Sequence, residues 1–239
     1  MTDSIYDDKF VQDLFNEMQD TYERVSNVTS FGFNLRWRKQ LVNQIGLESN
    51  MTVADLMGGS GETWRYIIPH LSDESLLYNV DFAQSMCDYA HIRHARMKNT
   101  NIKILQENAL SSSIPDNSVD AVICVYGVKT LDPYHYESFV REIKRVLKPQ
   151  GRFGLVEISV PKSALLRELY MFYLSQIVPI IGALLLGNHE NFRMLSKYMQ
   201  AFQNCETLAQ VFEAHNFDVS YHNFFFGCCT ALTGSYYVD

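Results

Sequence analysis

Apolar residues recur at helical spacing in two stretches near the start of the chain. Over residues 9–25 and again over residues 35–45, they return every three or four positions, as on one face of an amphipathic helix. The pattern predicts two helices before the first strand, which together form an N-terminal helical cap.

Short apolar runs then alternate with segments of helical periodicity. The runs have the length of strands buried in a parallel sheet, and they cover residues 51–56, 76–80, 102–106, 119–125 and 152–158. Helical patterns lie between them at residues 84–97 and 136–147. This alternation predicts an α/β fold built on a doubly wound parallel sheet.

The last part of the chain completes the sheet. Residues 193–201 and 206–215 have helical patterns, and residues 217–223 and 225–232 resemble an antiparallel pair of strands. The fold expected for the chain is therefore a mostly parallel, seven-stranded sheet.

One segment is apolar enough to be tested as a membrane span. Residues 169–187 approach the roughly 20 apolar residues that cross a bilayer, but they contain Ser175, Gln176 and Pro179. We expect no transmembrane segment here, but two short helices broken at Pro179 that cover an apolar pocket. Such a cover could also contact a membrane surface, although it has few of the basic residues usual for that role.

Charge and cysteine content narrow the class of protein. Twenty Lys and Arg residues against 27 Asp and Glu residues give a net charge of −7, with no basic cluster, so we expect no nucleic-acid partner. The five cysteines have neither metal-ligand nor disulfide-framework spacing. The acidic N-terminus does not resemble a secretory signal. These features favour a cytoplasmic protein with free thiols.

The strongest chemical signal is a glycine-rich turn after the first predicted strand. Residues 54–62 read Ala-Asp-Leu-Met-Gly-Gly-Ser-Gly-Glu, in which a ligand could lie against bare backbone amides at a helix start. The spacing differs from the G-x-G-x-x-G of dinucleotide sites, and a tight structural turn is the alternative for the motif alone.

Asp81 makes the case for a nucleoside site. It ends the second predicted strand, where a carboxylate can accept hydrogen bonds from both ribose hydroxyls. Phe82 and Met86 follow at positions suited to flank an adenine ring, although each could equally be a core residue. Asn108 and Ala109 come after the third strand, at the depth expected for the exocyclic amine of adenine.

With these motifs, the chain resembles the ubiquinone/menaquinone biosynthesis C-methyltransferase family of the UbiE type, over nearly its whole length. The resemblance rests on an ordered set of segments at residues 22–37, 55–61, 81–86, 145–149, 156–161 and 169–182. It implies a class I, Rossmann-like methyltransferase that uses S-adenosylmethionine and releases S-adenosylhomocysteine.

The resemblance also implies an organisation and a donor site. We expect one domain, residues 1–239, with a helical cap at 1–50, a cofactor-binding core at 51–160, a lid insertion at 161–204, and a C-terminal helix with antiparallel strands at 205–239. The residues expected to bind the cofactor are Asp55, Gly58, Gly59, Ser60, Gly61, Asp81, Phe82, Met86, Asn108, Ala109, Val125 and Tyr126.

The chain departs from the family where the acceptor should bind. The family's Asn and His in the cap are Ser26 and Asn34 here, and its Arg after the fourth strand is Lys129. Its His on the last strand, which we expect in the acceptor pocket, is Leu232. A lysine offers a point charge in place of a forked guanidinium, so a different acceptor is expected.

The leading hypothesis is methylation of a small phenolic, quinone-like or polyketide-like acceptor, most favourably at carbon. Such a reaction needs a base near the acceptor hydroxyl, and the candidates are Tyr22, Glu23, Lys129, His189 and Tyr198. The alternatives are O- or N-methylation, the quinone-biosynthesis step itself, and a non-catalytic S-adenosylmethionine sensor. No metal site is expected, and the sequence leaves a homodimer open.

Overall fold

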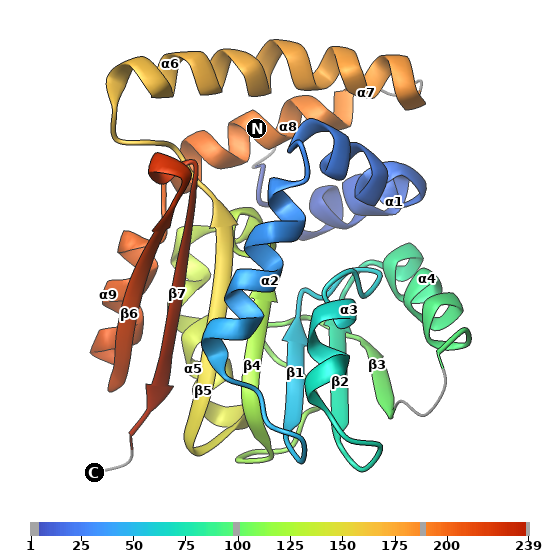
Figure 1. The fold of residues 1–239 in the computed structure, drawn as a ribbon, viewed down its shortest axis with the longest axis vertical. Coiled ribbons are helices and arrows are strands. Elements are labelled where there is room, and N and C mark those ends of the chain that lie inside the picture. Colours follow the sequence, from blue (N-terminus) through green and yellow to red (C-terminus); the bar gives the residue numbers. More distant parts are fainter. Residues whose placement is uncertain (1–4, 98–100, 187–189, 238–239) are drawn as a thin grey trace.

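The computed structural model describes residues 5–97, 101–186 and 190–237, and a seven-stranded sheet lies at their centre (Figure 1). The strand order is β3-β2-β1-β4-β5-β7-β6. The bounds are β1 Thr52–Leu56, β2 Leu76–Asp81, β3 Ile102–Gln106, β4 Val119–Val125, β5 Leu147–Ile158, β6 Phe217–Phe224 and β7 Cys229–Tyr236. β1 to β5 pair in parallel, and β7 runs antiparallel between β5 and β6. The predicted doubly wound, mostly parallel sheet is confirmed.

Helices cover both faces of this sheet because its strands are apolar on both sides. β4 supplies Val122 and Cys124 to one core and Ala121 and Ile123 to the other. The first core is closed by α5 (Tyr136–Val146) and α9 (Glu206–Ala214), and the second by α2 (Phe33–Ile45), α3 (Trp64–Ile67) and α4 (Gln84–His94). The order of the strands reverses between β1 and β4, and in such sheets the ligand crevice lies at the carboxyl ends of these strands.

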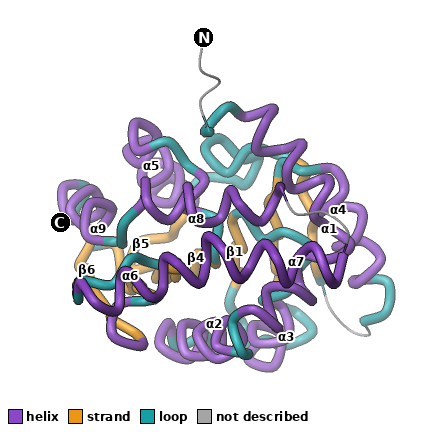
Figure 2. Tube along the Cα trace, turned by 90° about the horizontal axis from the view of Figure 1, so that it is seen from above, coloured by secondary structure: helices purple, strands orange, loops and turns teal. Residues whose placement is uncertain are grey.

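A third layer lies over those carboxyl ends (Figures 1 and 2). It consists of α1 (Asp8–Thr29), α6 (Ala164–Phe172), a π-helical turn (Tyr173–Ile177), α7 (Val178–Leu186) and α8 (Glu190–Phe202). These elements share a small core of their own, which includes Val11, Leu174 and Met199. The helical cap and the lid insertion therefore meet above the predicted cofactor-binding edge.

Two sequence predictions within this layer and the C-terminal hairpin are wrong. The segment around Pro179 is one continuous helical run, because the π turn bonds the Val178 N–H to the Tyr173 carbonyl and accommodates a residue that has no N–H of its own. The second strand of the hairpin begins at Cys229 and not at residue 225. Phe225 and Phe226 have φ values of 45° and 56° and form a tight turn with Gly227 (Phe225–Gly227).

Candidate active site

A glycine loop follows β1 and is fixed by the side chains of β2. The Gly58 N–H donates to the Val80 carbonyl at 3.0 Å, and a Cβ at Gly58 would come within 2.2 Å of Asn79 Oδ1. Asn79 Nδ2 donates to the Gly59 carbonyl at 3.2 Å, while its Oδ1 accepts from Trp64 Nε1 at 3.1 Å. Asn79 therefore holds the loop in place. It lies two residues before Asp81 on the same strand, and this spacing could have indicated its role.

Asp81 lies at the tip of β2 and supports the same loop. Its Oδ2 accepts from the Gly59 N–H at 2.9 Å, and its Oδ1 accepts from the Ala83 N–H at 3.0 Å. Burial raises the pKa of Asp81 to about 6, and the N–H donors of Ala83 and Gly59 oppose that rise. This carboxylate is therefore aimed at the loop by two backbone donors.

Two more carboxyl groups lie beside Asp81. Asp55, at the end of β1, is fully buried, and neither of its carboxylate oxygens has a hydrogen-bond partner among the described residues. Burial, followed by the nearby charge of Glu62, raises its pKa to about 8, while the guanidinium of Arg38 acts in the opposite direction. Asp81 and Glu62 give the loop region an acidic character that attracts cations, whereas a pKa of about 8 keeps Asp55 largely protonated near neutral pH.

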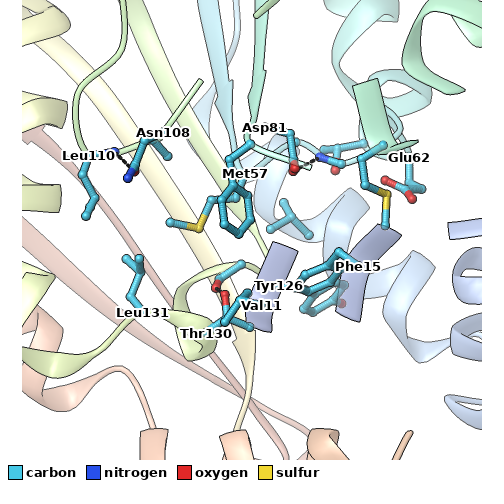
Figure 3. A pocket seen from close by; sticks show the side chains of 18 of the residues that line it. Val11, Phe15, Met57, Glu62, Asp81, Asn108, Leu110, Tyr126, Thr130 and Leu131 are labelled. Carbon is cyan, nitrogen blue, oxygen red and sulfur yellow. Dashed lines mark hydrogen bonds between the residues drawn. The ribbon is translucent and has the colours of Figure 1, made fainter. Parts of the chain in front are cut away.

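Glu62 and Asp81 border a cavity of about 80 Å³, which we call the glycine-loop pocket. Figure 3 shows Asp81 and Glu62 toward one end of it, Asn108 and Leu131 toward the other, and Met57 between them. The predicted cofactor residues that line it are Gly58, Gly59, Asp81, Phe82, Met86, Asn108, Ala109, Val125 and Tyr126. The structure therefore brings these residues together from four separate strand ends, and their contact with a cofactor stays a prediction.

Three predicted cofactor residues are not among the described residues that line this pocket: Asp55, Ser60 and Gly61. Asp55 lies beneath the loop, and Ser60 donates to Glu62 Oε1 at 3.0 Å. Gly61 has a φ of 81°, and a Cβ there would come within 2.5 Å of the Trp64 ring, so this glycine serves the packing of the loop. All three support the pocket from behind.

The helical cap closes the glycine-loop pocket from above, which the sequence did not predict. Asp8, Val11 and Phe15 of α1 line it. Gln12 Nε2 donates to the Phe82 carbonyl at 2.6 Å, and Asn16 Oδ1 accepts from the Ser85 N–H at 3.0 Å. α1 is thereby fastened to the segment that follows β2.

A second cavity, which we call the apolar pocket, has a volume of about 320 Å³. It lies between the two cap helices, the lid helices and the turn at Phe225, and its lining includes Trp37, Tyr170, Leu174 and Val178. Ser26 and Asn34 also line it, and Asn34 Nδ2 donates to Ser26 Oγ at 3.0 Å. The two departures from the family pattern in the cap therefore lie in one wall.

Tyr126 lines both pockets. It follows β4 with a φ of 62°, in the left-handed region, and its hydroxyl donates to the Asn34 carbonyl at 3.0 Å. Its ring lies 5.2 Å from the Arg38 guanidinium. Tyr126 therefore lies at the boundary between the two pockets.

Lys129 is the catalytic candidate that the structure places in the apolar pocket. Its Nζ donates to the Tyr126 carbonyl and lies 3.2 Å from Oε1 of Glu157, a fully buried residue at the end of β5. Glu157 Oε2 also accepts a hydrogen bond from the backbone N–H of Lys129 at 3.2 Å. Burial raises the pKa of Glu157, and the Lys129 ammonium opposes that rise. Glu157 is not among the site residues predicted from the sequence.

The other catalytic candidates are elsewhere or undescribed. Glu23 forms an ion pair with Arg93 at 2.8 Å and is absent from the described lining of both pockets. Tyr198 is buried and donates to the Ile5 carbonyl at 2.6 Å, again outside the described lining. His189 and the side chain of Tyr22 lie outside the described residues. Leu232 packs in the core with Phe153 and Phe212, so the expectation that it faces the acceptor is wrong.

Known proteins resemble this chain over nearly its whole length. The family model described as the ubiE/COQ5 methyltransferase family matches residues 2–235. The demethylmenaquinone methyltransferase of Lactiplantibacillus plantarum is 29% identical over 227 residues, which are 94% of this chain and 95% of the relative. That of Geobacillus stearothermophilus is 28% identical over 225 residues, with the same coverage.

Among solved structures, a SAM-dependent methyltransferase from Aquifex aeolicus superposes with a TM-score of 0.59 at 18% sequence identity. The match covers 83% of this chain and 88% of that one. At this level of identity the likeness concerns the fold, and it agrees with the Rossmann-like sheet described above.

Proposed function

The chain belongs to the ubiE/COQ5 methyltransferase family, and from that membership we propose that it methylates a carbon atom of a small phenolic or quinol-like acceptor. Membership makes the chain an enzyme, a methyltransferase that depends on S-adenosylmethionine. The alternative of a non-catalytic sensor is therefore set aside.

The residues of the glycine-loop pocket fit this donor. S-adenosylmethionine supplies an electrophilic methyl group on a positively charged sulfonium. The carboxyls of Glu62 and Asp81, which line the pocket, suit a cationic ligand. In the proposal, Asp81 accepts hydrogen bonds from the ribose hydroxyls, and Asn108 with Ala109 lies beside the adenine.

The acceptor is assigned to the apolar pocket. The observation that carries this assignment is that Tyr126 lines both cavities, so an acceptor in one can approach a methyl group in the other. Transfer from a sulfonium is an in-line displacement, for which alignment of the reacting atoms provides much of the rate. The walls of the apolar pocket would hold an aromatic ring and exclude water from it.

Lys129 is the residue to which we assign the charge chemistry. An aromatic carbon becomes nucleophilic when a hydroxyl on its ring loses a proton. An ammonium group in a buried apolar wall favours the resulting oxyanion, and Glu157 keeps that ammonium in place at 3.2 Å. Lys129 would then lower the pKa of the acceptor hydroxyl and stabilise its anion.

The identity of the acceptor is the finer part of the proposal. The relatives named above are demethylmenaquinone methyltransferases, so a naphthoquinol is the first compound to test. Ser26, Asn34 and Lys129 all line the apolar pocket where the family pattern is different, and these changes favour a related acceptor of altered shape or polarity. The O- and N-methylation alternatives use the same cavities and differ only in the atom that faces the donor.

The test is a turnover assay with S-adenosylmethionine and a panel of acceptors. The panel contains prenylated and short-chain naphthoquinols, benzoquinols, other polyphenols and an aromatic amine. We expect S-adenosylhomocysteine and a product whose mass fragmentation places the methyl group on a ring carbon. Methylation at oxygen or nitrogen throughout the panel would contradict the proposal.

We assign the reaction to the cytoplasm. All five cysteines are buried free thiols, which suits a reducing compartment.

A further inference from the structure

The helical run from α6 through the π turn into α7 has apolar residues on two opposite faces. Its inner face contributes Tyr170, Leu174 and Val178 to the apolar pocket. Its outer face carries Leu165, Leu169, Phe172 and Ile180, which are between 51% and 70% exposed. The run is long and apolar enough to cross a membrane, yet only 17% of its most apolar 18-residue stretch is buried inside the molecule. A helix that is apolar all round is normally covered on all sides.

The outer face lies on the outside of the molecule. In Figure 1 the run forms the top edge of the molecule, beyond the carboxyl ends of the parallel strands. In Figure 2, seen from above, it crosses the middle of the view. The π turn keeps the run continuous across Pro179, so that the apolar outer residues continue from Leu165 to Ile180.

Exposed aromatic residues extend this surface to the mouth of the apolar pocket. Phe31, in the turn between α1 and α2, is 79% exposed, lines the pocket and stacks on Tyr173 at 6.1 Å. Phe225 lies 4.7 Å from Phe33 and 5.8 Å from Phe226, which is 80% exposed. Phe31 and Phe225 both line the pocket and are exposed, so apolar side chains lie at its opening to the surface.

We propose that this face, formed by Phe31, Leu165, Leu169, Phe172, Ile180, Phe225 and Phe226, rests on a lipid bilayer. The helical run then lies in the plane of the interface, with its outer residues among the acyl chains. A contact with the bilayer covers the exposed residues and leaves the mouth of the pocket in touch with the apolar phase. A second copy of the chain on the same face would cover the mouth as well. The run does not span the bilayer, because its inner residues form a wall of the pocket.

The contact is apolar in character and depends little on anionic lipid. The basic residues at the start of the run are already engaged: Lys162 pairs with Glu206, and Arg167 donates to the backbone carbonyls of Pro161 and Lys162. Binding to neutral lipid is therefore expected, with little effect of salt.

This proposal goes beyond the reaction and holds whichever atom of the acceptor is methylated. Its one dependence on the proposed function is the route of the acceptor, which would enter the apolar pocket from the bilayer between Phe31 and Phe225.

The experiment is flotation of the full-length protein with phosphatidylcholine vesicles on a density gradient. We expect the wild type to float with the vesicles, and the Leu169→Ser/Phe172→Ser variant to lose at least about tenfold in partitioning, since two large apolar side chains no longer insert. The matched control is Tyr89→Ser/Ile92→Ser, which removes two exposed apolar side chains from α4 and should float like the wild type. Circular dichroism and turnover of a water-soluble acceptor show whether each variant is folded, and failure of the proposed reaction would leave the flotation result unchanged.

A second measurement reports insertion directly. Phe172→Trp should shift its emission to the blue on vesicle addition and be quenched by brominated acyl chains, whereas Ile92→Trp should not. The proposal is overturned if the Leu169→Ser/Phe172→Ser variant floats as well as the wild type. It is equally overturned if the wild type stays with the soluble fraction. If the wild type is then a dimer and Leu169→Ser/Phe172→Ser is a monomer, the face binds a second copy of the chain.

Discussion

At the scale of single residues, two carboxyl groups next to the glycine loop, those of Asp55 and Asp81, have raised pKa values. Asp81 could be predicted from the sequence, because an acidic residue at the tip of the second strand has a known use in nucleoside sites. The state of Asp55 could not, because its lack of a partner depends on how Arg38 and Glu62 pack around it. Glu157 escaped prediction for a similar reason, since its partner Lys129 is 28 residues away in sequence.

The raised pKa of Asp81 predicts how donor binding depends on pH. With a pKa of about 6, the Asp81 carboxylate, which we propose accepts hydrogen bonds from the ribose hydroxyls, is lost as the pH falls through that value. The affinity for S-adenosylmethionine should therefore fall about tenfold per pH unit below pH 6, and be level between pH 6.5 and 7. Isothermal calorimetry between pH 5 and 7 measures this, and Asp81→Asn should bind more weakly with no such dependence. An affinity of the wild type that stays constant down to pH 5 would contradict the role of Asp81.

Asp55 predicts a pH dependence of stability. A carboxyl whose pKa rises from 3.8 in the unfolded chain to about 8 in the fold holds more protons when folded, so the free energy of unfolding decreases as the pH rises between those values. Asp55→Asn removes that loss, so its free energy of unfolding should gain several kcal/mol on that of the wild type between pH 5 and 9, at about 1.4 kcal/mol per unit up to pH 8. Urea unfolding of both proteins at the two pH values tests this. The exposed Asp73→Asn serves as control and should follow the wild type.

Variants of the Lys129–Glu157 pair can distinguish a role in stability from a role in the reaction. Lys129→Met leaves the fully buried Glu157 carboxylate without its cation and should cost about 3 to 5 kcal/mol of stability. The double variant Lys129→Met/Glu157→Gln should recover most of that stability. If Lys129 stabilises the acceptor anion, the double variant should still lose about a hundredfold in kcat. Recovery of turnover along with stability would show that the pair serves the fold alone.

At the scale of elements, the sequence predicted regular segments well and irregular ones badly. The parallel strands were found because their apolar runs are continuous, and the crevice at their carboxyl ends follows from strand order. The π turn before Pro179 was missed because a proline usually ends a helix, and nothing in the local pattern shows the extra residue in the turn. The turn at Phe225 was read as strand because aromatic residues favour strands.

The contact between α1 and the segment after β2 predicts slow exchange of the donor. Gln12 and Asn16 hold the helix over the glycine-loop pocket through two hydrogen bonds. Gln12→Ala/Asn16→Ala should raise the dissociation rates of donor and product by roughly 5- to 30-fold, at about 1 kcal/mol per lost bond. Stopped-flow displacement of S-adenosylhomocysteine measures the rate, with the exposed Gln210→Ala as control. Equal rates in all three proteins would mean that α1 does not limit exchange.

At the scale of the whole molecule, all five thiols report on the integrity of the fold. Every cysteine is buried and free, and burial raises the pKa of Cys87 to about 12 and that of Cys228 to about 11. In the native protein at pH 8 the thiolate is thus at least about a hundredfold scarcer than for an ordinary thiol. Ellman's reagent should label all five only at the rate of global unfolding, and S-adenosylhomocysteine should slow the labelling. Rapid labelling of even one thiol in the native protein would reveal a local opening.

The position of Tyr126 on both cavity walls constrains attempts to re-engineer this enzyme. A smaller residue there would enlarge the space for a bulkier alkyl group on a donor analogue, but it would also remove the hydroxyl that is bonded to the Asn34 carbonyl and so loosen the opposite cavity. The range of donors and the range of acceptors thus cannot be changed independently at this residue. A library of variants at Tyr126 has to be screened against pairs of one donor and one acceptor.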